Sequence, residues 1–374
     1  MTPASFDVAI AGGGPGGAAT ALSLLSHAPF LSVVLIEATR YDSHRVGETL
    51  PPPARAVLEH LGVWDTFHSQ GHHEVHGTSA AWGGANPLDN DFFYMPANVG
   101  WHLDRTAFDA MLAGEAQRRG ATLLLDTRVR DARRTGEGWR LELSDSDGIT
   151  ARFIVDATGG AGLARRYGAR FVEADRLVGI AGFFDSRDGD PQTLVEAFEH
   201  GWWYTAGLPK SRRIVVCMTD ADVARGMRMH EPKEWRRTLA AMPHVGAMVG
   251  KREVAHTVMI RSASSRRLEP VIGNDWLAVG DAASRFDPLS SQGIFKALRS
   301  GVFASYAIGD LLGRGDRDGL KRYSRYVVEE FKSYTEIRRK YYCAEQRWPA
   351  SEFWRRRQGT GLVDAPSALS ARRE

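Results

Sequence analysis

The feature that most constrains the fold is a glycine-rich turn between an apolar strand and an apolar helix near the N-terminus. Residues 6–12 (FDVAIAG) have the pattern of a buried strand, and residues 16–28 are rich in Ala and Leu. A second apolar run, residues 32–38 (SVVLIEA), follows them. Two buried strands separated by one helix predict a βαβ unit, and therefore an α/β fold with a Rossmann-like parallel sheet.

Four residues of this unit have the spacing of a dinucleotide-binding fingerprint. Gly12 permits the tight turn, Gly14 lets the backbone approach a pyrophosphate, and Gly17 lets the helix pack on the sheet. Glu37 lies at the end of the second strand, twenty residues after Gly17, where a carboxylate accepts hydrogen bonds from a ribose. The alternative is a purely structural glycine turn. The position of Glu37 favours dinucleotide binding.

Length, charge and cysteine content limit the class of protein. The 374 residues exceed one ordinary core, so we expect two interleaved domains. The net charge of +3 is too small to indicate nucleic-acid binding, and two cysteines cannot form a disulfide framework. No apolar run reaches the length of a membrane span, and the N-terminus lacks the pattern of a signal peptide. The sequence therefore predicts a cytoplasmic enzyme.

A second motif lies late in the chain, in the segment GDAASRFDPLSSQGIFKAL that begins at Gly280. It resembles the GD motif and the proline-containing loop of the FAD-dependent monooxygenase superfamily. That resemblance implies that Asp281 holds the ribityl chain and that Pro288 lies in the loop beside the flavin. It also implies that the helix start at Gly293 and Ile294 faces the flavin, where its dipole stabilises the charge of the reduced ring. The alternative is an aspartate that only caps a helix.

Three further segments resemble the same superfamily in the expected order. Residues 45–51 (RVGETLP) resemble the VGE segment of flavin-dependent halogenases, and residues 101–105 (WHLDR) resemble the element (L/V)DR-x-x-F-D. Residues 156–159 (DATG) resemble the turn that closes over the dinucleotide. For Arg105 the alternative is a surface position at a helix start. Besides Gly12, Gly14, Gly17 and Glu37, the resemblance implies that the FAD-binding residues are Arg45, Gly47, Glu48, Arg105, Val129, Thr158, Gly159, Asp281, Pro288, Gly293 and Ile294.

The resemblance also implies the architecture, which is similar to that of p-hydroxybenzoate hydroxylase. It consists of a Rossmann-like FAD-binding domain with a β-meander, an interleaved β-sheet substrate domain and a C-terminal helical region. We place the FAD-binding domain at 1–75, 103–165 and 266–315. The substrate domain takes 76–102 and 166–265, and the helical region takes 316–374.

Departures from the halogenase pattern bear on the reaction. Tryptophan halogenases carry W-x-W-x-I-P and D-P-L-E-S-T-G-I, whereas this chain reads YTAGLP from Tyr204 and DPLSSQGI from Asp287. Ser290 therefore stands in the position of the halogenase Glu. Arg55 aligns with the halogenase Lys, and a guanidinium cannot take the place of that amine because it stays protonated. The pattern disfavours halogenation. A partial match to Y-x-W-x-F-P-K leaves a prenyl-lipid reductase of the geranylgeranyl reductase type as an alternative.

The strongest overall resemblance is to the flavoproteins that mature cysteine or lysine tryptophylquinone-containing amine and amino-acid oxidases. It is carried by VGETLPP, GWWYTAGLP, DPLSSQGI and YYCAEQRWPASEFWRRR. It implies an FAD-dependent monooxygenase that uses O₂ to hydroxylate a Trp side chain of a partner precursor oxidase. The sequence leaves open whether electrons come from NAD(P)H or from a separate flavin reductase. A hydroxylase or halogenase of a free small aromatic compound, and a non-catalytic flavin-dependent binding module, stay as alternatives.

Two groups of residues are expected on the reacting side of the flavin. Ser290, Ser291 and Gln292 are placed next to the flavin pyrimidine ring and the activated oxygen. Trp202, Trp203, Tyr204 and Ala206 are expected to line the substrate side, with ordinary core packing as the alternative for the aromatic residues. Five histidines between His60 and His76 lack Cys or carboxylate partners at a recognised spacing, so no metal site is expected.

Overall fold

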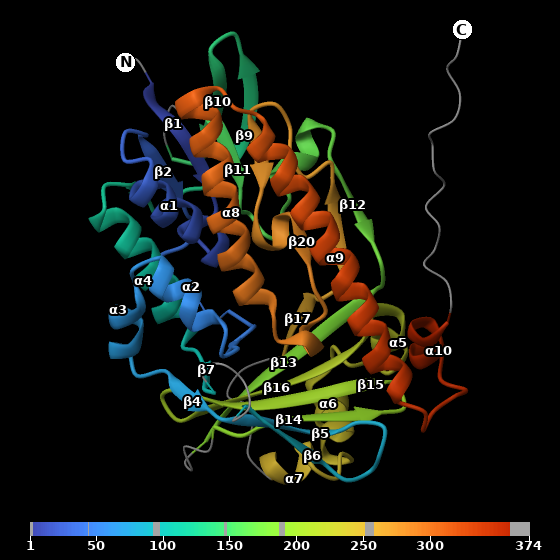
Figure 1. The fold of residues 1–374 in the computed structure, drawn as a ribbon. Helices are drawn as coiled ribbons and strands as arrows, with labels where there is room; N and C mark the ends of the chain where they lie inside the picture. The colour runs from blue at the N-terminus through green and yellow to red at the C-terminus, as the bar shows by residue number, and fades with distance from the viewer. Residues whose placement is uncertain are drawn as a thin grey trace, which may run out of the picture.

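Two seven-stranded sheets and a pair of long helices form the frame of the protein (Figure 1). The first sheet carries the glycine-rich turn, and the second sheet lies below it in the view of Figure 1. Each sheet combines segments that are far apart in the sequence. This computed structural model describes residues 3–43, 45–92, 98–145, 148–186, 191–250 and 258–359.

The first sheet has the strand order β8-β2-β1-β11-β10-β9, and β19 pairs with the last three residues of β11. Strands β8, β2, β1, β11 and β19 are parallel, whereas β9 and β10 add antiparallel strands at one side. The strands are β1 (Ala4–Ala11), β2 (Val33–Ile36), β8 (Thr122–Leu124), β9 (Val129–Thr135), β10 (Gly138–Leu143), β11 (Ile149–Asp156) and β19 (Trp276–Ala278). The predicted βαβ unit and β-meander are confirmed.

Four of these parallel strands end at one edge of the sheet, because parallel neighbours point the same way. They end at Ala11, Ile36, Asp156 and Ala278. Ligands of such sheets bind outside the carboxyl ends of the strands. The fold therefore gathers at this edge the residues that follow the four ends, which are Gly12, Glu37, Thr158 and Asp281.

Most of the longer helices lie on or beside the first sheet, and α1 packs directly on α8. A Cβ atom at Gly301 of α8 would lie 2.5 Å from the carbonyl oxygen of Gly16, so a side chain there would separate the two helices. Figure 1 shows α9 continuing from α8 down to the second sheet, so one helix spans both. The helices are α1 (Pro15–His27), α2 (Ala54–His60), α3 (Trp64–Ser69), α4 (Arg105–Arg118), α8 (Gly293–Arg314), α9 (Asp318–Ala344) and α10 (Glu352–Gln358).

The second sheet has the strand order β17-β13-β16-β15-β14-β5-β6 and two differently covered faces. Helices α5 (Ala221–Gly226), α6 (Pro232–Ala240) and α7 (Val245–Val249) flank it, and Trp235 of α6 packs into the core on one face. The other face contacts α9 and α10. The strands are β5 (Gly77–Ala81), β6 (Leu88–Asp91), β13 (Leu177–Asp185), β14 (Thr193–Phe198), β15 (Gly201–Leu208), β16 (Arg212–Asp220) and β17 (Met259–Ser262).

In the described residues, two three-stranded sheets and three short 3₁₀ turns complete the fold. The small sheets have the orders β12-β18-β20 and β3-β7-β4. Their strands are β3 (Thr49–Leu50), β4 (His73–Val75), β7 (Gly100–His102), β12 (Arg170–Glu173), β18 (Arg266–Glu269) and β20 (Ser284–Arg285). The turns are η2 (Leu163–Tyr167), η3 (Gly280–Ala282) and η4 (Pro288–Ser290).

The predicted fold class is confirmed, and the differences from expectation concern packing. In the described part of segment 166–265, β13 to β17 are antiparallel neighbours in the second sheet and β12 pairs with β18 in a small sheet. Strand β5, from the expected substrate segment 76–102, pairs with β14 of the second sheet, and β6 pairs with β5. Strand β7 from the same segment pairs instead with β3 and β4. Of the expected helical region 316–374, residues 360–374 lie outside the described part. Among all residues that the structure describes, no helix is long and apolar enough to cross a membrane.

The N-terminus of α4 is fixed by a buried histidine and an aspartate cap. Asp104 accepts hydrogen bonds from the backbone N–H groups of Thr106 and Ala107, which places Arg105 in the first turn. The Nδ1 atom of His72 accepts from the backbone N–H of Asp104 at 3.2 Å, and its Nε2 lies 3.0 Å from the Gln70 side-chain oxygen. Burial lowers the pKa of His72 to about 4. Among the described residues, no cluster of His, Cys, Asp and Glu side chains could hold a metal ion.

The buried His72 generates a prediction for stability against pH. Because its pKa falls from an ordinary 6.5 to about 4 on folding, the unfolded chain binds more protons between these values, and stability falls as pH is lowered through this window. Relative to the variant His72→Gln, the wild type should lose about 3 kcal/mol more unfolding free energy between pH 7 and pH 4. Urea unfolding at both pH values measures the difference. Equal losses would contradict the assignment of a neutral, buried His72.

Candidate functional site

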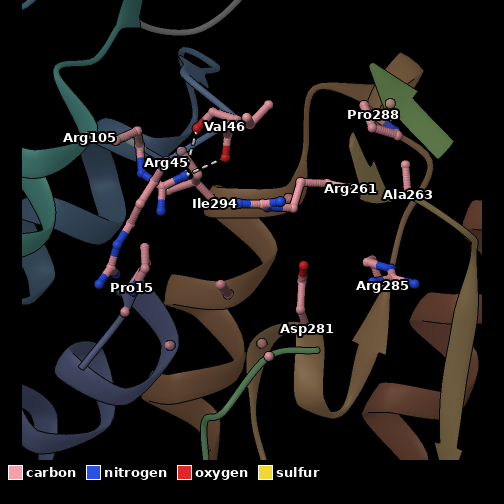
Figure 2. A pocket seen from close by; sticks show the side chains of 18 of the residues that line it. Pro15, Arg45, Val46, Arg105, Arg261, Ala263, Asp281, Arg285, Pro288 and Ile294 are labelled. Carbon is pink, nitrogen blue, oxygen red and sulfur yellow. Dashed lines mark hydrogen bonds between the residues drawn. The ribbon is translucent and has the colours of Figure 1, made fainter. Parts of the chain in front are cut away.

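A continuous cavity of about 810 Å³ lies between the carboxyl edge of the first sheet and one face of the second sheet. Figure 2 shows part of it, with Pro15, Asp281, Ile294 and Pro288 facing a common space. Pro15 comes from α1, Asp281 from η3, Pro288 from η4 and Ile294 from α8. The volume lies within the usual range for cofactor and small-molecule sites. The two distant motifs of the sequence therefore border one cavity.

The glycine-rich turn provides one end of the cavity. Gly12 has φ +114°, and a Cβ there would lie 2.2 Å from the carbonyl oxygen of Ala157, so only glycine fits. A Cβ at Gly17 would lie 2.0 Å from the oxygen of Gly12, which explains its packing role; Gly17 itself does not line the cavity. Gly14 faces open space and precedes α1, whose first N–H groups have no side-chain cap. This arrangement suits a pyrophosphate.

Beside the turn, two arginines share one buried carboxylate. Arg45 and Arg105 both line the cavity, and both form ion pairs with Asp109 at 2.9 Å. The Asp109 side chain is wholly buried, so it fixes both guanidinium groups. Arg45 also pairs with Glu37 at 2.8 Å, and Glu37 accepts a hydrogen bond from the backbone N–H of Gly13 at 2.9 Å. Arg105 is thus largely buried rather than a surface helix-start residue.

Sequence reasoning did not assign a role to Asp109, although the last position of the quoted DR-x-x-F-D element corresponds to it. Its position four residues after Arg105 puts both on one face of α4, which could have signalled the pair. The structure adds that Asp109 also binds Arg45, which comes from a loop about 60 residues earlier in the chain than Arg105. Local spacing cannot show this second contact.

Glu48 joins the arginine cluster to the second sheet. Its carboxylate is buried and accepts a hydrogen bond from the Tyr204 hydroxyl at 2.9 Å. Burial raises the pKa of the Glu48 carboxyl, and the hydrogen bond from Tyr204 and the nearby Arg105 oppose that rise. Arg105 also donates to the carbonyl oxygen of Gly47 at 2.7 Å. Glu48, which was expected to hold the cofactor, lines the cavity. Its hydrogen-bond partner Tyr204 was expected on the substrate side.

Asp281 extends into the cavity and is paired with a buried lysine. Its side chain is 43% exposed, and its Oδ1 lies 3.0 Å from the Nζ of Lys296, which is only 2% exposed. Figure 2 shows Asp281 pointing into the open space, as a ligand-binding carboxylate would. Asp156, the last residue of β11, accepts from the backbone N–H of Thr158 at 3.0 Å and shapes the next turn. Val129, Thr158 and Gly159 line the same space.

The loop before α8 is fixed by α9. Asp287 is buried and accepts hydrogen bonds from the Tyr342 hydroxyl at 2.7 Å and from Arg338 Nε at 3.2 Å. Its backbone N–H donates to the Tyr334 hydroxyl at 2.6 Å. Three side chains of one helix thus hold the start of this loop. Pro288, Ser291, Gly293 and Ile294 line the cavity, whereas Ser290 and Gln292 do not.

The expectation that Ser290 and Gln292 face the reacting space therefore fails for both side chains. Ser290 turns back, and its hydroxyl donates to the carbonyl oxygen of Asp287 at 3.1 Å. Gln292 is exposed and precedes the first residue of α8. Ser291 lies between them with φ 51°, a left-handed conformation that directs the chain into α8. The sharp turn decides which serine reaches the cavity, and the order of residues alone does not reveal it.

Residues on strand β15 divide between the two faces of the second sheet. Trp202 and Tyr204 line the cavity. Trp203 does not: it points to the other face and packs on Trp235 with ring centroids 5.3 Å apart. The correction follows from the alternation of side chains along a strand. Ala206 shares the face of Tyr204 but is wholly buried and is not part of the cavity wall.

The sequence missed most of the remaining wall. Apolar residues of the second sheet cover much of it, and two arginines, Arg261 and Arg285, also line it, with the Arg261 side chain reaching toward Ile294 (Figure 2). Arg285 donates to the Ser264 carbonyl oxygen at 2.8 Å and to the Ser262 hydroxyl at 2.9 Å. These residues have no motif spacing, because the sheet brings them together from separate strands. The apolar set of the second sheet includes Ala181, Val195, Val216, Met218 and Met259, and Leu289 of η4 joins them.

The space around Gly14 gives a test of ligand binding that leaves the fold intact. Gly14→Val should fold normally, because an added Cβ meets no atom within 4 Å, but its side chain should block a phosphate from the backbone. Purified variant should retain little FAD, read from its flavin absorbance, while its thermal unfolding without FAD matches the wild type. Gly114→Val in α4, where a Cβ also meets open space, is the matched control and should retain FAD.

The contacts of Asp287 predict a stability effect. Asp287→Asn removes the charge that accepts from Arg338 and Tyr342, so it should lower the unfolding free energy by about 2 kcal/mol. Asp318→Asn at the start of α9, where the carboxylate is 65% exposed, should leave stability unchanged. Equilibrium unfolding of both variants measures the effect. An Asp287→Asn protein as stable as the wild type would show that this cluster does not hold the loop.

Comparison with known proteins identifies the family. A family profile described as "FAD binding domain" matches residues 5–329. The chain is 29% identical over 375 residues to a protein named "Putative FAD-dependent oxidoreductase LodB" from Marinomonas mediterranea, covering 97% of this chain and 100% of that one. It is 26% identical to the flavin-dependent halogenase gsfI of Penicillium aethiopicum, covering 84% of this chain and 66% of the halogenase.

Solved structures share the whole fold. The flavin-dependent halogenase CmlS superposes with a TM-score of 0.86 and 28% identity, covering 97% of this chain and 69% of that chain. The peptidyl tryptophan dihydroxylase QhpG, described as essential for tryptophylquinone cofactor biogenesis, superposes with a TM-score of 0.80 and 27% identity. That match covers 97% of this chain and 80% of QhpG. These findings confirm the predicted resemblance to the superfamily that contains both groups.

Proposed function

The chain belongs to the FAD binding domain family, and on that premise we propose that it is an FAD-dependent monooxygenase that hydroxylates a protein-bound Trp side chain. The observation that carries the proposal is the composition of the cavity wall. One end consists of glycine backbone and arginines, which suits a dinucleotide, and the other end consists of apolar and aromatic side chains of the second sheet. A cofactor and an aromatic ring therefore fit in the same cavity.

The residues of the first sheet fit FAD. Gly12, Gly14 and the start of α1 suit the pyrophosphate, Glu37 would accept hydrogen bonds from a ribose, and Asp281 extends toward the middle of the cavity. The start of α8 at Gly293 and Ile294 would face the flavin ring. When bound and reduced, FAD would supply the two electrons that activate O₂, of which one oxygen atom enters the ring and the other leaves as water.

The protein's own part in this reaction is to hold the ring and exclude water. Trp202 and Tyr204 form an aromatic wall, with Val195, Val216 and Met218 beside them on the same face. Such a surface binds a flat apolar ring through area burial and ring contacts. It also keeps bulk water from the reacting atoms until the oxygen is transferred. Arg45 and Arg105 contribute positive charge at the cofactor end.

Hydroxylation is favoured over halogenation by the basic groups of the wall. Among the described residues that line the cavity, the basic side chains are all arginines, which cannot act as the amine of a halogenase. Arg55, which aligns with the halogenase lysine, is half exposed, pairs with Glu59 and lies outside the cavity wall. Ser290, in place of the halogenase glutamate, faces away from the cavity.

A protein-bound Trp as substrate is supported by one relative of known structure. The match to LodB, a putative FAD-dependent oxidoreductase, covers 97% of this chain and 100% of that one, whereas the match to gsfI covers 66% of that halogenase. QhpG, whose described substrate is a peptidyl tryptophan, shares the fold over 97% of this chain. We propose accordingly that the partner is a precursor oxidase whose Trp becomes a tryptophylquinone. Electrons would come from a pyridine nucleotide or from a separate flavin reductase.

The test is a single-turnover reaction with an unmodified precursor oxidase. FAD-loaded protein is reduced chemically without air, mixed with the precursor, and then exposed to O₂ in the presence of chloride and bromide. Peptide mass spectrometry should find one added oxygen atom on one Trp. The Gly14→Val variant, which should not hold FAD, is the control. Chlorine or bromine isotope patterns would instead establish halogenation, and an unchanged precursor would refute the proposal.

A further inference from the structure

The central strands of the second sheet present three polar side chains to the cavity, and all three have their hydrogen atoms directed elsewhere. These side chains are Thr193 on β14 and Trp202 and Tyr204 on β15, within the described part of strands β13 to β16. The indole N–H of Trp202 donates to the Tyr342 hydroxyl at 3.0 Å. Arg261 and Ser262, by contrast, belong to edge strand β17. The polarity of the inner wall is therefore decided by Thr193 and Tyr204.

The Thr193 hydroxyl is oriented by a buried histidine. His102 is wholly buried, and its Nδ1 lies 2.8 Å from the carbonyl oxygen of Gly207, which can only accept. Nδ1 therefore carries the ring proton. In the neutral ring, which burial favours, Nε2 is the acceptor, and it lies 2.7 Å from the Thr193 hydroxyl oxygen. The Thr193 hydrogen points to His102, so its oxygen lone pairs are left for the cavity.

The Tyr204 hydroxyl is oriented in the same way by Glu48. It donates to Oε2 of the Glu48 carboxylate at 2.9 Å. Burial and the nearby Glu48 raise the pKa of Tyr204 well above 10, so this hydroxyl keeps its proton. Arg105, on the other side of Glu48, opposes the rise in the Glu48 pKa that burial causes. The phenol oxygen thus also offers only lone pairs to the cavity.

The two hydroxyl groups lie on one face of neighbouring strands. Tyr204 is opposite Val195, and Thr193 is opposite Ala206, so the two polar residues are diagonal neighbours in the antiparallel pair. Between them the wall is apolar. The inner wall thus combines a flat apolar surface with hydrogen-bond acceptors. The hydrogen atoms of Thr193, Trp202 and Tyr204 already take part in hydrogen bonds within the protein.

We propose that this wall selects an aromatic ring that carries an N–H group, which donates to the oxygen of Tyr204 or Thr193. The inference rests on the proposed function and adds the residues that recognise the substrate, Tyr204 and Thr193. An indole N–H would satisfy an otherwise unpaired acceptor, whereas a ring of the same shape without a donor would leave that acceptor buried and unpaired. Glu48 and His102 act as positioning residues, because they turn the two hydroxyl groups.

The test compares two probes that differ only at the ring heteroatom. N-acetyltryptophanamide carries the N–H, and its benzothiophene analogue has sulfur in that place. Titration calorimetry with the FAD-loaded protein should show a three- to tenfold lower dissociation constant for the indole probe, the effect expected of about one hydrogen bond. Tyr204→Phe and Thr193→Val together should remove this preference. Thr193→Ser alone, which keeps the hydroxyl, should retain it, and so should Tyr341→Phe on the exposed face of α9.

Each outcome decides the inference. Equal binding of both probes by the wild type, or no binding of either, would overturn it, and this comparison does not depend on whether any variant folds. A preference that persists in the double variant would also overturn it. A protein that hydroxylates Trp in its partner but binds both probes equally would retain the proposed function and lose the inference. A protein that prefers the indole probe but leaves the partner unchanged would support the inference and refute the proposed function.

Discussion

The parallel pairing of β2, β1, β11 and β19 is the constraint on which the rest of the site depends. Because these strands run in one direction, their carboxyl ends meet at one edge, and the loops that follow must share the space outside it. Residues separated by about 270 positions, Gly12 and Asp281, therefore border one cavity. The glycine turn supplies backbone donors there, and the late loop supplies a carboxylate. Neither segment could form this arrangement alone.

Buried charges connect that edge to the rest of the molecule. Asp109 fixes two arginines at the cofactor end, and Glu48 extends from the same region to Tyr204 of the second sheet. On the opposite side, Asp287 is held by α9, and Arg338 pairs with Asp175 at 2.7 Å as well. A buried charge is stabilising only when partners surround it, so each cluster fixes the relative position of the elements that supply those partners. The two sheets are thus joined by polar contacts as well as by packing.

The sequence predicted what depends on local spacing and missed what depends on pairing between distant strands. Gly12, Gly14 and Glu37 were recognisable because a turn, a close approach and a ribose acceptor need those residue types at fixed intervals. Asp281 and Gly293 were found through resemblance. By contrast, the opposite orientations of Trp202 and Trp203 depend on which face of β15 meets the cavity. The sharp turn at Ser291 and the buried Lys296 likewise became visible only with the tertiary structure.

The attachment of the η4 loop to α9 limits how a molecule can enter the cavity. Three side chains of one long helix hold Asp287, and Tyr342 also accepts from Trp202 in the wall. A movement of this loop away from α9 would break the hydrogen bonds of Asp287 with all three side chains. Strand β17, by contrast, is an edge strand, and Ile260, Arg261 and Ser262 are all exposed on it. A bulky substrate that entered along β17 would leave these buried contacts intact and would pass Arg261, which lines the cavity.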